Sequence, residues 1–329
     1  MKRVTLKDIA AALGVSVGTV SHALSDMDDI SEEVKIKVRE KTAEMGYISD
    51  DVANSLRSGK TNTIAIIVPD ISNQLISSQI KLIETQARQN GYVPIIFNTN
   101  ENEEIESSAI MAALRKRVDG ILLCPAQHNK DNLRLLQKRK VPFVLFGRFF
   151  ESEDTSYVCS DDVKGGRLAA EYLLNIGCRN PIYIGTEDYL ECSVNRLRGI
   201  KEAFAAEGLS FPESRVIRTS SESGYGMETC GKLSLFPETV DSIIVFSDTV
   251  AFDIRYHLLN LKSDLAGLPV VSFDMTHSYY PLPFHHISIG MKGDGLASES
   301  FRILMNRISD PESQNEHVLV DVELHEFCR

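Results

Sequence analysis

Apolar residues in the first 46 positions recur three or four places apart, which is the spacing of one face of an α-helix. Ile9 and Leu13 share a face of a first predicted helix, and Val20 and Leu24 share a face of a second. Gly14 ends the first helix and opens a tight turn. Two helices joined in this way form a helix-turn-helix, and the second is short enough to enter the major groove of DNA.

Hydroxyl side chains stand where each predicted helix begins. Thr5 is placed as the N-cap of the first helix, with Asp8 at the third helical position in a variant of the capping box. Ser16 caps the second helix, and Ser31 caps a third. The third helix has inward apolar residues and a terminal glycine, which are Val34, Val38, Met45 and Gly46. We therefore predict a small helical domain over residues 1–46.

The chain changes character over residues 47–61. The stretch 47–51 reads Tyr-Ile-Ser-Asp-Asp and cannot build a core. Val52–Leu56 is long enough for about one helical turn, which is at the lower limit of what is stable alone. Ser58–Thr61 contains a glycine and interrupts it. These features predict a hinge linker.

From Thr63 onward, apolar runs alternate with helical stretches. The runs are continuously apolar, as is typical of parallel strands covered on both faces. They are Ile64–Val68, Val93–Phe97, Gly120–Cys124, Val141–Phe146, Ile182–Ile184, Ser242–Phe246 and Pro269–Phe273. Helical stretches include Ile80–Gln89, Ile105–Arg115, Gly165–Asn175 and Arg198–Glu207. This repeat predicts an α/β core of doubly wound parallel sheet, as one large sheet or two lobes, with ligands beyond the carboxyl ends of the strands.

The net charge of −11 at pH 7 is distributed unevenly. Residues 1–60 carry nine basic and ten acidic side chains, whereas residues 61–329 carry 26 and 36. This balance argues against indiscriminate binding of nucleic acid but allows a small DNA-reading domain on an acidic body. No apolar run approaches the ~18 residues of a membrane span, and no apolar stretch follows the first charges. We therefore expect no membrane association, no signal peptide and a cytoplasmic location.

Sequence motifs of catalysis and metal binding are missing. The six cysteines stand singly, without a C-x-x-C pair, which disfavours a zinc module or a disulfide scaffold. His285 and His286 have no carboxylate or cysteine at ligand spacing, so a surface pair is favoured over a metal site. Lys60 and Thr61 match the end of a phosphate-binding loop, but Asn54 stands where such a loop needs glycine. We expect no enzyme activity, no metal and no cofactor.

The chain resembles the lactose-repressor family of bacterial transcription regulators. The head motif consists of Val4–Ala10 and Gly14–Ser21. Weaker motifs follow in the family's order, at Val68–Asn73, Val118–Ile121, Gly165–Ala169, Arg196–Gly199, Ser247–Asp248 and Phe273–Asp274. The match covers nearly the whole chain. It implies a dimeric repressor with a periplasmic-binding-protein-like effector core of two lobes.

The resemblance places base reading on the second helix. Val17, Gly18 and His22 stand at the family's positions that face the major groove. Valine offers methyl contact, best matched to a thymine methyl, and glycine offers no side chain. The single imidazole of His22 can donate to or accept from a base edge, depending on its tautomer, but cannot make the bidentate contact of an arginine.

Contacts to the DNA backbone are expected from four hydroxyl side chains, which are Thr5, Ser16, Thr19 and Ser21. Thr5 and Ser16 suit simple capping as well, and that alternative stays open. By resemblance, Leu56 is a wedge that enters the minor groove and bends the operator, which requires one hinge from each subunit. The acidic residues Asp50 and Asp51 beside it would be repelled by phosphates.

Six polar residues at strand ends are candidates for effector binding by resemblance, namely Asp70, Asn73, Arg148, Arg196, Asp248 and Asp274. Carboxylates and arginine suit a polyhydroxylated ligand, because a carboxylate accepts hydroxyl hydrogens and the guanidinium donates in a fork. Asp70 and Asp248 could instead cap the helices that follow them. The aromatic candidates for stacking on the effector are Phe149, Phe150, Tyr189 and Phe252.

These observations together predict three parts: a helix-turn-helix domain over residues 1–46, a hinge over 47–61 and an effector-binding and dimerisation core over 62–329. The predicted function is a sequence-specific transcriptional regulator, a repressor that binds near-palindromic double-stranded operator DNA as a homodimer. Its small-molecule effector is expected to be a sugar or sugar derivative. Two alternatives remain, a global regulator controlled by a partner protein and a solute-binding protein; the head counts against the second.

Overall fold

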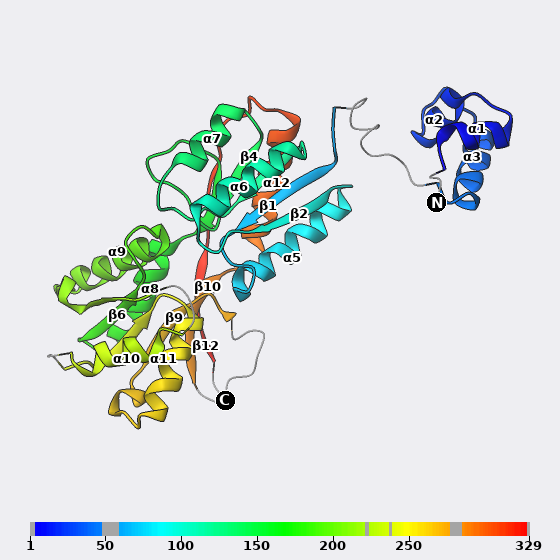
Figure 1. The fold of residues 1–329 in the computed structure, drawn as a ribbon. Coiled ribbons are helices and arrows are strands. Elements are labelled where there is room, and N and C mark those ends of the chain that lie inside the picture. The colour runs from blue at the N-terminus through cyan, green and yellow to red at the C-terminus, as the bar shows by residue number, and fades with distance from the viewer. Residues whose placement is uncertain (1–3, 48–58, 221–223, 237–238, 277–284, 328–329) are drawn as a thin grey trace. The chain divides into compact units, whose positions relative to one another are not determined.

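The computed structural model describes residues 4–47, 59–220, 224–236, 239–276 and 285–327 (Figure 1). The chain divides into two compact units, Met1–Thr61 and Asn62–Arg329, which are described separately below. No described helix is both long enough and apolar enough to cross a membrane.

The first unit contains three helices, α1 (Leu6–Leu13), α2 (Val17–Leu24) and α3 (Glu32–Glu44). Its core consists of Ile9, Ala10, Val20, Ala23 and Val38, all nearly inaccessible to solvent. Gly14 ends α1 with a φ of 69°, in the left-handed region that favours glycine. The helix-turn-helix predicted from the spacing of apolar residues is therefore confirmed.

The second unit contains two six-stranded sheets, which settles the choice between one sheet and two lobes. Sheet 1 has, in spatial order, β11 (His317–Val320), β5 (Tyr157–Ser160), β4 (Phe143–Phe146), β3 (Gly120–Leu123), β1 (Thr63–Val68) and β2 (Val93–Asn98). Sheet 2 has β12 (Val322–Phe327), β10 (His286–Met291), β9 (Val270–Phe273), β8 (Ser242–Val245), β6 (Pro181–Gly185) and β7 (Val216–Arg218). Every paired strand is parallel to its neighbour except β12, which runs antiparallel to β10.

Helices cover both faces of sheet 1, and this explains the continuously apolar strands. The α-helices of the second unit are α5 (Gln74–Gln89), α6 (Glu103–Arg115), α7 (Asp131–Arg139), α8 (Asp162–Asn175), α9 (Glu191–Ala206), α10 (Gly226–Ser234), α11 (Asp248–Asn260) and α12 (Gly295–Ser309). In β1, Ile64 and Ile66 pack with α5 and α12, whereas Ala65 and Ile67 pack with α6 and α7. Successive residues of a strand face opposite sides, so both sets must be apolar.

The predicted strand Val93–Phe97 forms β2, but it lies at the edge of sheet 1 and is not covered on both faces. Val93 and Ile96 are exposed, with 64% and 40% of their surface accessible. The strands β5, β7, β10, β11 and β12 were not among the predicted runs. They are short, polar or alternating segments that pair near the sheet margins.

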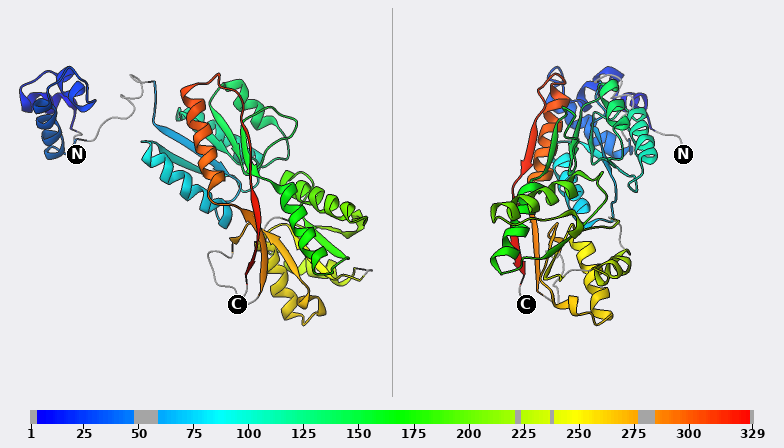
Figure 2. Two further views of the ribbon diagram at one scale, coloured as in Figure 1. Left: turned by 180° about the vertical axis from the view of Figure 1, so that it is seen from behind. Right: turned by 90° about the vertical axis from the view of Figure 1, so that its left-hand side faces the viewer.

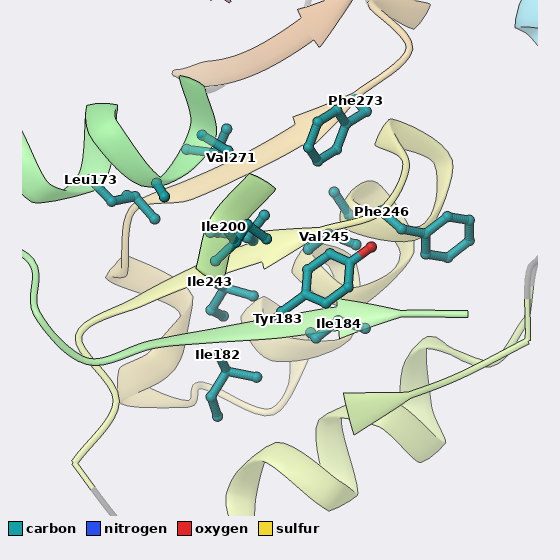
Figure 3. Close-up of a cluster of buried hydrophobic side chains, with 14 of the residues drawn as sticks. Leu173, Ile182, Tyr183, Ile184, Ile200, Ile243, Val245, Phe246, Val271 and Phe273 are labelled. Atoms are coloured by element: carbon teal, nitrogen blue, oxygen red, sulfur yellow. The ribbon is translucent and has the colours of Figure 1, made fainter. Parts of the chain in front are cut away.

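The chain passes between the sheets three times, at Ser160–Asp162, Met291–Gly295 and Val320–Val322. These crossings define lobe 1, built on sheet 1 with α5, α6, α7 and α12, and lobe 2, built on sheet 2 with α8, α9, α10 and α11 (Figures 1 and 2). Figure 3 shows the core of lobe 2, with Tyr183 and Ile184 on strand β6 and Val245 on the neighbouring strand β8. The tyrosine hydroxyl donates to the carbonyl oxygen of Ser193 at 3.0 Å, so a buried polar atom ties β6 to α9.

Candidate functional site

The first turn of α2 presents an open surface on the head. Ser16, Val17 and Gly18 are exposed, and Val17 keeps 39% of its surface accessible although it is apolar. Thr19, Ser21 and His22 are half-buried on the same short helix. Val20 and Ala23 of this helix point into the core, so the opposite face is left for a partner.

Two of the four predicted hydroxyl contacts of the head, Thr5 and Ser16, are also helix caps. The Thr5 hydroxyl oxygen accepts from the Asp8 backbone N–H at 3.4 Å, and the Asp8 carboxylate accepts from the Thr5 backbone N–H at 2.8 Å, which completes the capping box. Ser16 Oγ accepts from the Thr19 backbone N–H at 2.9 Å. Ser31 stands at the N-cap of α3 without a side-chain capping bond. A capping hydroxyl at an exposed helix start remains compatible with a phosphate contact.

His22 has a defined partner, Asp29, whose Oδ2 lies 2.7 Å from His22 Nδ1. A carboxylate oxygen can only accept, so Nδ1 carries the proton of this bond. In the neutral ring, Nε2 is then an acceptor. The structure thus selects one of the two tautomers that the sequence left open. The wedge residue expected from the hinge, Leu56, lies outside the described residues.

The second unit contains a cleft of about 600 Å³ lined by both lobes. Lobe 1 contributes residues just after β1, β3 and β4, and lobe 2 contributes residues just after β8 and β9. This is the carboxyl edge of the parallel sheets, where the doubly wound fold was expected to bind ligands. Five of the six predicted effector residues line the cleft, namely Asp70, Asn73, Arg148, Arg196 and Asp274.

Arg196 lies at the base of the cleft and holds three segments of lobe 2. Its Nε donates to Asp162 Oδ1 at 2.7 Å, its Nη1 donates to the Phe246 carbonyl, and its Nη2 lies 3.5 Å from Asp274 Oδ1. Its guanidinium carbon stands 4.3 Å from the centre of the Phe273 ring. The arginine is 7% exposed and is therefore a structural centre as well as a ligand candidate.

Asp274 combines an unusual backbone with a perturbed carboxyl. Its φ of 94° lies in the left-handed region that residues with a Cβ rarely adopt. Burial raises the pKa of its carboxyl to about 7, although the nearby Arg196 charge opposes the change. Strained backbone and a shifted pKa in one cleft residue are features that concentrate at functional sites.

Arg148 lines the cleft from lobe 1, and its guanidinium is already bonded to other groups of the protein. Its guanidinium makes two bonds to Glu101, at 2.8 and 2.6 Å, and a third to the Pro125 carbonyl at 3.0 Å. Asn73 is the N-cap of α5, with its Oδ1 accepting from Leu75 at 3.0 Å. Asp70 does not cap α5, and its carboxylate accepts from the backbone and hydroxyl of Ser72 in the preceding turn.

The expectation for Asp248 must be corrected, because this residue does not line the cleft. Ser247 caps α11, and the Asp248 carboxylate lies beneath the surface, fully buried. Its oxygens accept from Ser288 and from the Thr276 backbone, both at 2.8 Å. His286 Nε2 lies 3.0 Å from the same carboxylate. With 2% exposure, His286 belongs to this internal network and not to a surface pair; its neighbour His285 contacts Glu326 at 2.8 Å.

The four aromatic residues expected to stack on the effector do not line the cleft. Phe149 stacks on Tyr157 with ring centres 4.2 Å apart, and Tyr189 contacts His128 at 3.9 Å. The described lining contains Phe146 and Phe246, which are almost fully buried.

Several cleft residues were missed from the sequence: Glu101, Asp162 behind Arg196, Gln79, Cys124 and Cys192. Glu101 lies in a polar turn before α6, and Asp162 is the first residue of α8, so only their partners reveal them. Burial raises the pKa of both the Cys124 and the Cys192 thiol to about 12, so these cysteines remain protonated and weakly nucleophilic.

Glu191, the first residue of α9, is expected to make core stability fall as pH rises. Burial, followed by the negative charge of Asp162, raises the pKa of its carboxyl to about 8. Its Oε2 is buried without a hydrogen-bond partner among the described residues. Because the folded pKa exceeds the unfolded value near 4.5, only the folded state keeps the proton between these values. Stability should therefore fall by at most about 1.4 kcal/mol per pH unit up to pH ~8, then level off.

Urea unfolding of the wild type and of Glu191→Gln between pH 5 and 9 measures this effect. The variant should lose less stability than the wild type over that range. Parallel stability profiles for the two proteins would show that Glu191 is ionised in the folded core throughout.

Both units of the chain match models of known protein families. A family model described as bacterial regulatory proteins, lacI family, matches residues 5–50. A second, described as periplasmic binding proteins and sugar binding domain of LacI family, matches residues 61–261. The HTH-type transcriptional regulator DegA of Bacillus subtilis is 30% identical over 281 residues, covering 83% of this chain and 82% of the relative. The ribose operon repressor of Escherichia coli is 25% identical, covering 95% and 96%.

Solved structures show the same fold. The lac repressor dimer bound to operator and the anti-inducer ONPF is similar with a TM-score of 0.86 at 19% identity, covering 98% of each chain. A transcriptional regulator CelR–cellobiose complex is similar with a TM-score of 0.72 at 24% identity, also over 98% of each chain. The relatives named here are transcription regulators rather than enzymes.

Proposed function

We propose that this chain, which belongs to the lacI family of bacterial regulatory proteins and is thus a DNA-binding transcription regulator, is a repressor. A carbohydrate effector either releases it from its operator DNA or enables it to bind there. The repressor acts as a homodimer on a near-palindromic operator, in the cytoplasm where that DNA lies. The observation that carries the proposal is one chain that joins a helix-turn-helix head to a two-lobed core with a polar cleft. The lac repressor dimer on its operator and the CelR–cellobiose complex support both halves.

In the head, Val17, Gly18 and His22 are proposed to face base edges. Gly18 and His22 lie on the side of α2 away from Val20 and Ala23, and Val17 is exposed in its first turn. Thr5, Ser16, Thr19 and Ser21 are proposed to contact phosphates and set the register of the helix. Leu56 is proposed as the minor-groove wedge of the hinge.

In the core, Asp70, Asn73, Arg148, Arg196 and Asp274 are proposed to contact the effector, with Asp248 supporting them from beneath. The Arg196 centre joins Asp162, at a crossing between the lobes, to Asp274 at the cleft. A ligand that hydrogen bonds with Arg196 or Asp274 therefore acts directly on the chain crossing at Ser160–Asp162, about which the two lobes would move. Its differential affinity for two arrangements of the lobes would couple the cleft to the operator.

The test is a selection of genomic fragments by the purified full chain, followed by footprinting of the recovered sites and titration with a carbohydrate panel. The expected result is a protected near-palindromic site whose occupancy changes with at least one carbohydrate. Recovery of fragments without a shared site would overturn the proposed regulator. Occupancy that no carbohydrate changes would overturn the proposed effector class.

His22→Ala is expected to cost about 1–3 kcal/mol of operator binding at one symmetric pair of positions, with a smaller effect on non-specific DNA. Since Nδ1 is bonded to Asp29, the neutral ring presents an acceptor, which suits the amino group of adenine or cytosine. Binding to operators substituted at each position, at fixed salt, measures the effect. Lys37→Ala on α3, whose charge pairs with Glu33, serves as the control. An unchanged base preference in His22→Ala would remove His22 from the recognition surface.

A further inference from the structure

Gln79 is a buried polar residue that lines the cleft. It lies on α5, one turn after Leu75 and Ile76, and all three side chains line the cleft. Gln79 is 7% exposed, and its Oε1 has no hydrogen-bond partner among the described residues. A buried amide left without hydrogen bonds costs about 1–3 kcal/mol, so a ligand atom that hydrogen bonds with this side chain would bind favourably.

A hydroxyl group is the ligand atom that fits this amide best. The amide of a glutamine has an acceptor oxygen and a donor nitrogen, and a hydroxyl can both donate and accept. It can therefore bond whichever end of the Gln79 amide faces the cleft. The apolar neighbours Leu75 and Ile76 leave room for the carbon frame that carries such a hydroxyl.

The charges of the cleft oppose an anionic ligand. Its described lining contains no lysine or histidine, and both of its arginines already hold carboxylates. Arg148 is bidentate to Glu101, and Arg196 is paired with Asp162 and lies close to Asp274. Asp70 adds a further carboxylate to the lining. A phosphate would have to displace these partners and enter a surface with more acidic than basic groups.

The helix N-termini at the cleft are also occupied by acceptors. Asn73 Oδ1 takes the first free N–H groups of α5, at 3.0 and 3.3 Å. The first backbone N–H of α9, that of Glu191, already donates to Gln127 Oε1 at 3.3 Å, and the first turn of α11 carries the Asp248 carboxylate. Helix N-termini bind phosphate when their N–H groups are free and no negative charge stands beside them. None of these three meets both conditions.

We propose that the effector is an uncharged, unphosphorylated carbohydrate and that Gln79 hydrogen bonds one of its hydroxyl groups. The inference rests on the proposed function and narrows its ligand class. The cleft volume of about 600 Å³ lies inside the range of roughly 300–1,000 Å³ typical of small-molecule sites.

The experiment uses the full chain and matched pairs of probes: ribose and ribose 5-phosphate, fructose and fructose 1-phosphate, and glucose and glucose 6-phosphate, with cellobiose added. Calorimetry measures binding to the wild type, Gln79→Met and Gln89→Met. Methionine has about the length of glutamine but no amide, and Gln89 is an exposed residue at the end of the same helix. We expect a neutral sugar to bind at least ten-fold more tightly than its phosphate. Gln79→Met should weaken that binding about ten-fold, whereas Gln89→Met should leave it unchanged.

Thermal unfolding without sugar separates binding from folding. Gln79→Met removes an unsatisfied amide, so its melting temperature should equal or exceed that of the wild type. Tighter binding of a phosphorylated member of any pair would overturn the inference, as would equal sugar affinity in Gln79→Met and the wild type. Operator binding is measured in parallel on the same proteins. Operator release by a sugar phosphate would leave the proposed regulator intact while refuting this specificity, so the two failures are distinguishable.

Discussion

Replacing Arg196 by alanine is expected to lower the free energy of unfolding of the core by about 3–5 kcal/mol and to abolish the effector response. The side chain is 7% exposed and pairs with Asp162 at 2.7 Å. Its removal leaves the carboxylates of Asp162 and Asp274 buried without a counter-charge, and it leaves the Phe246 carbonyl without its donor. A buried charge left without its partner costs far more free energy than the intact ion pair contributes to stability.

Urea unfolding of the second unit and calorimetry with a bound sugar measure these two effects. The matched control is Arg198→Ala, two residues along α9. The side chain of Arg198 is half-exposed and stands 3.9 Å from Glu151, a surface contact that contributes less than about 1 kcal/mol. If Arg196→Ala unfolded at the urea concentration of the wild type and still bound sugar, Arg196 would be neither the centre of the site nor a support of the fold.

The elements that could be predicted from the sequence are those whose burial requires a regular pattern of apolar residues. The strand β1 is apolar from Ile64 to Val68 because both faces are covered there, and α2 is marked by Val20 and its cap Ser16. The strands at the margins carry no such pattern. His286–Met291 alternates polar and apolar residues, because Ser288 and His286 belong to a buried polar network around Asp248. Polar burial of this kind depends on tertiary partners and leaves no periodic signal.

The same reasoning applies to the cleft. Polar residues directly after buried strands could be located, and five of the six proposed residues meet at one edge. Asp248 follows its strand in the same way, yet its place in the first turn of α11 directs its carboxylate toward Ser272 and Ser288, away from the cleft. Gln79 was missed because it lies in mid-helix, where a glutamine is an ordinary helix former. Only its burial and its unsatisfied oxygen distinguish it.

Gly166→Ala is expected to destabilise the core by roughly 3 kcal/mol and to weaken effector binding at least ten-fold. A Cβ at Gly166 of α8 would stand 1.9 Å from the carbonyl oxygen of Arg196 on α9, and a Cβ at Gly199 would stand equally close to the Val163 carbonyl oxygen. These obstacles are backbone atoms, so the two helices must separate to admit a methyl group. Separation moves the backbone of Arg196 itself, and with it the guanidinium at the base of the cleft.

Gly231→Ala is the matched control, since it places the same methyl group in the middle of helix α10. A Cβ there meets nothing within 4 Å, and the site is exposed. Alanine should therefore stabilise that variant by about 0.5–1 kcal/mol, through lower backbone entropy in the unfolded chain. The opposite signs of the two changes separate close helix packing from helix propensity. If Gly166→Ala were stabilised like the control, the α8–α9 contact would have to be looser than the structure shows. Arg196 would then owe its position to its ion pairs with Asp162 and Asp274 rather than to the glycine contact beneath it.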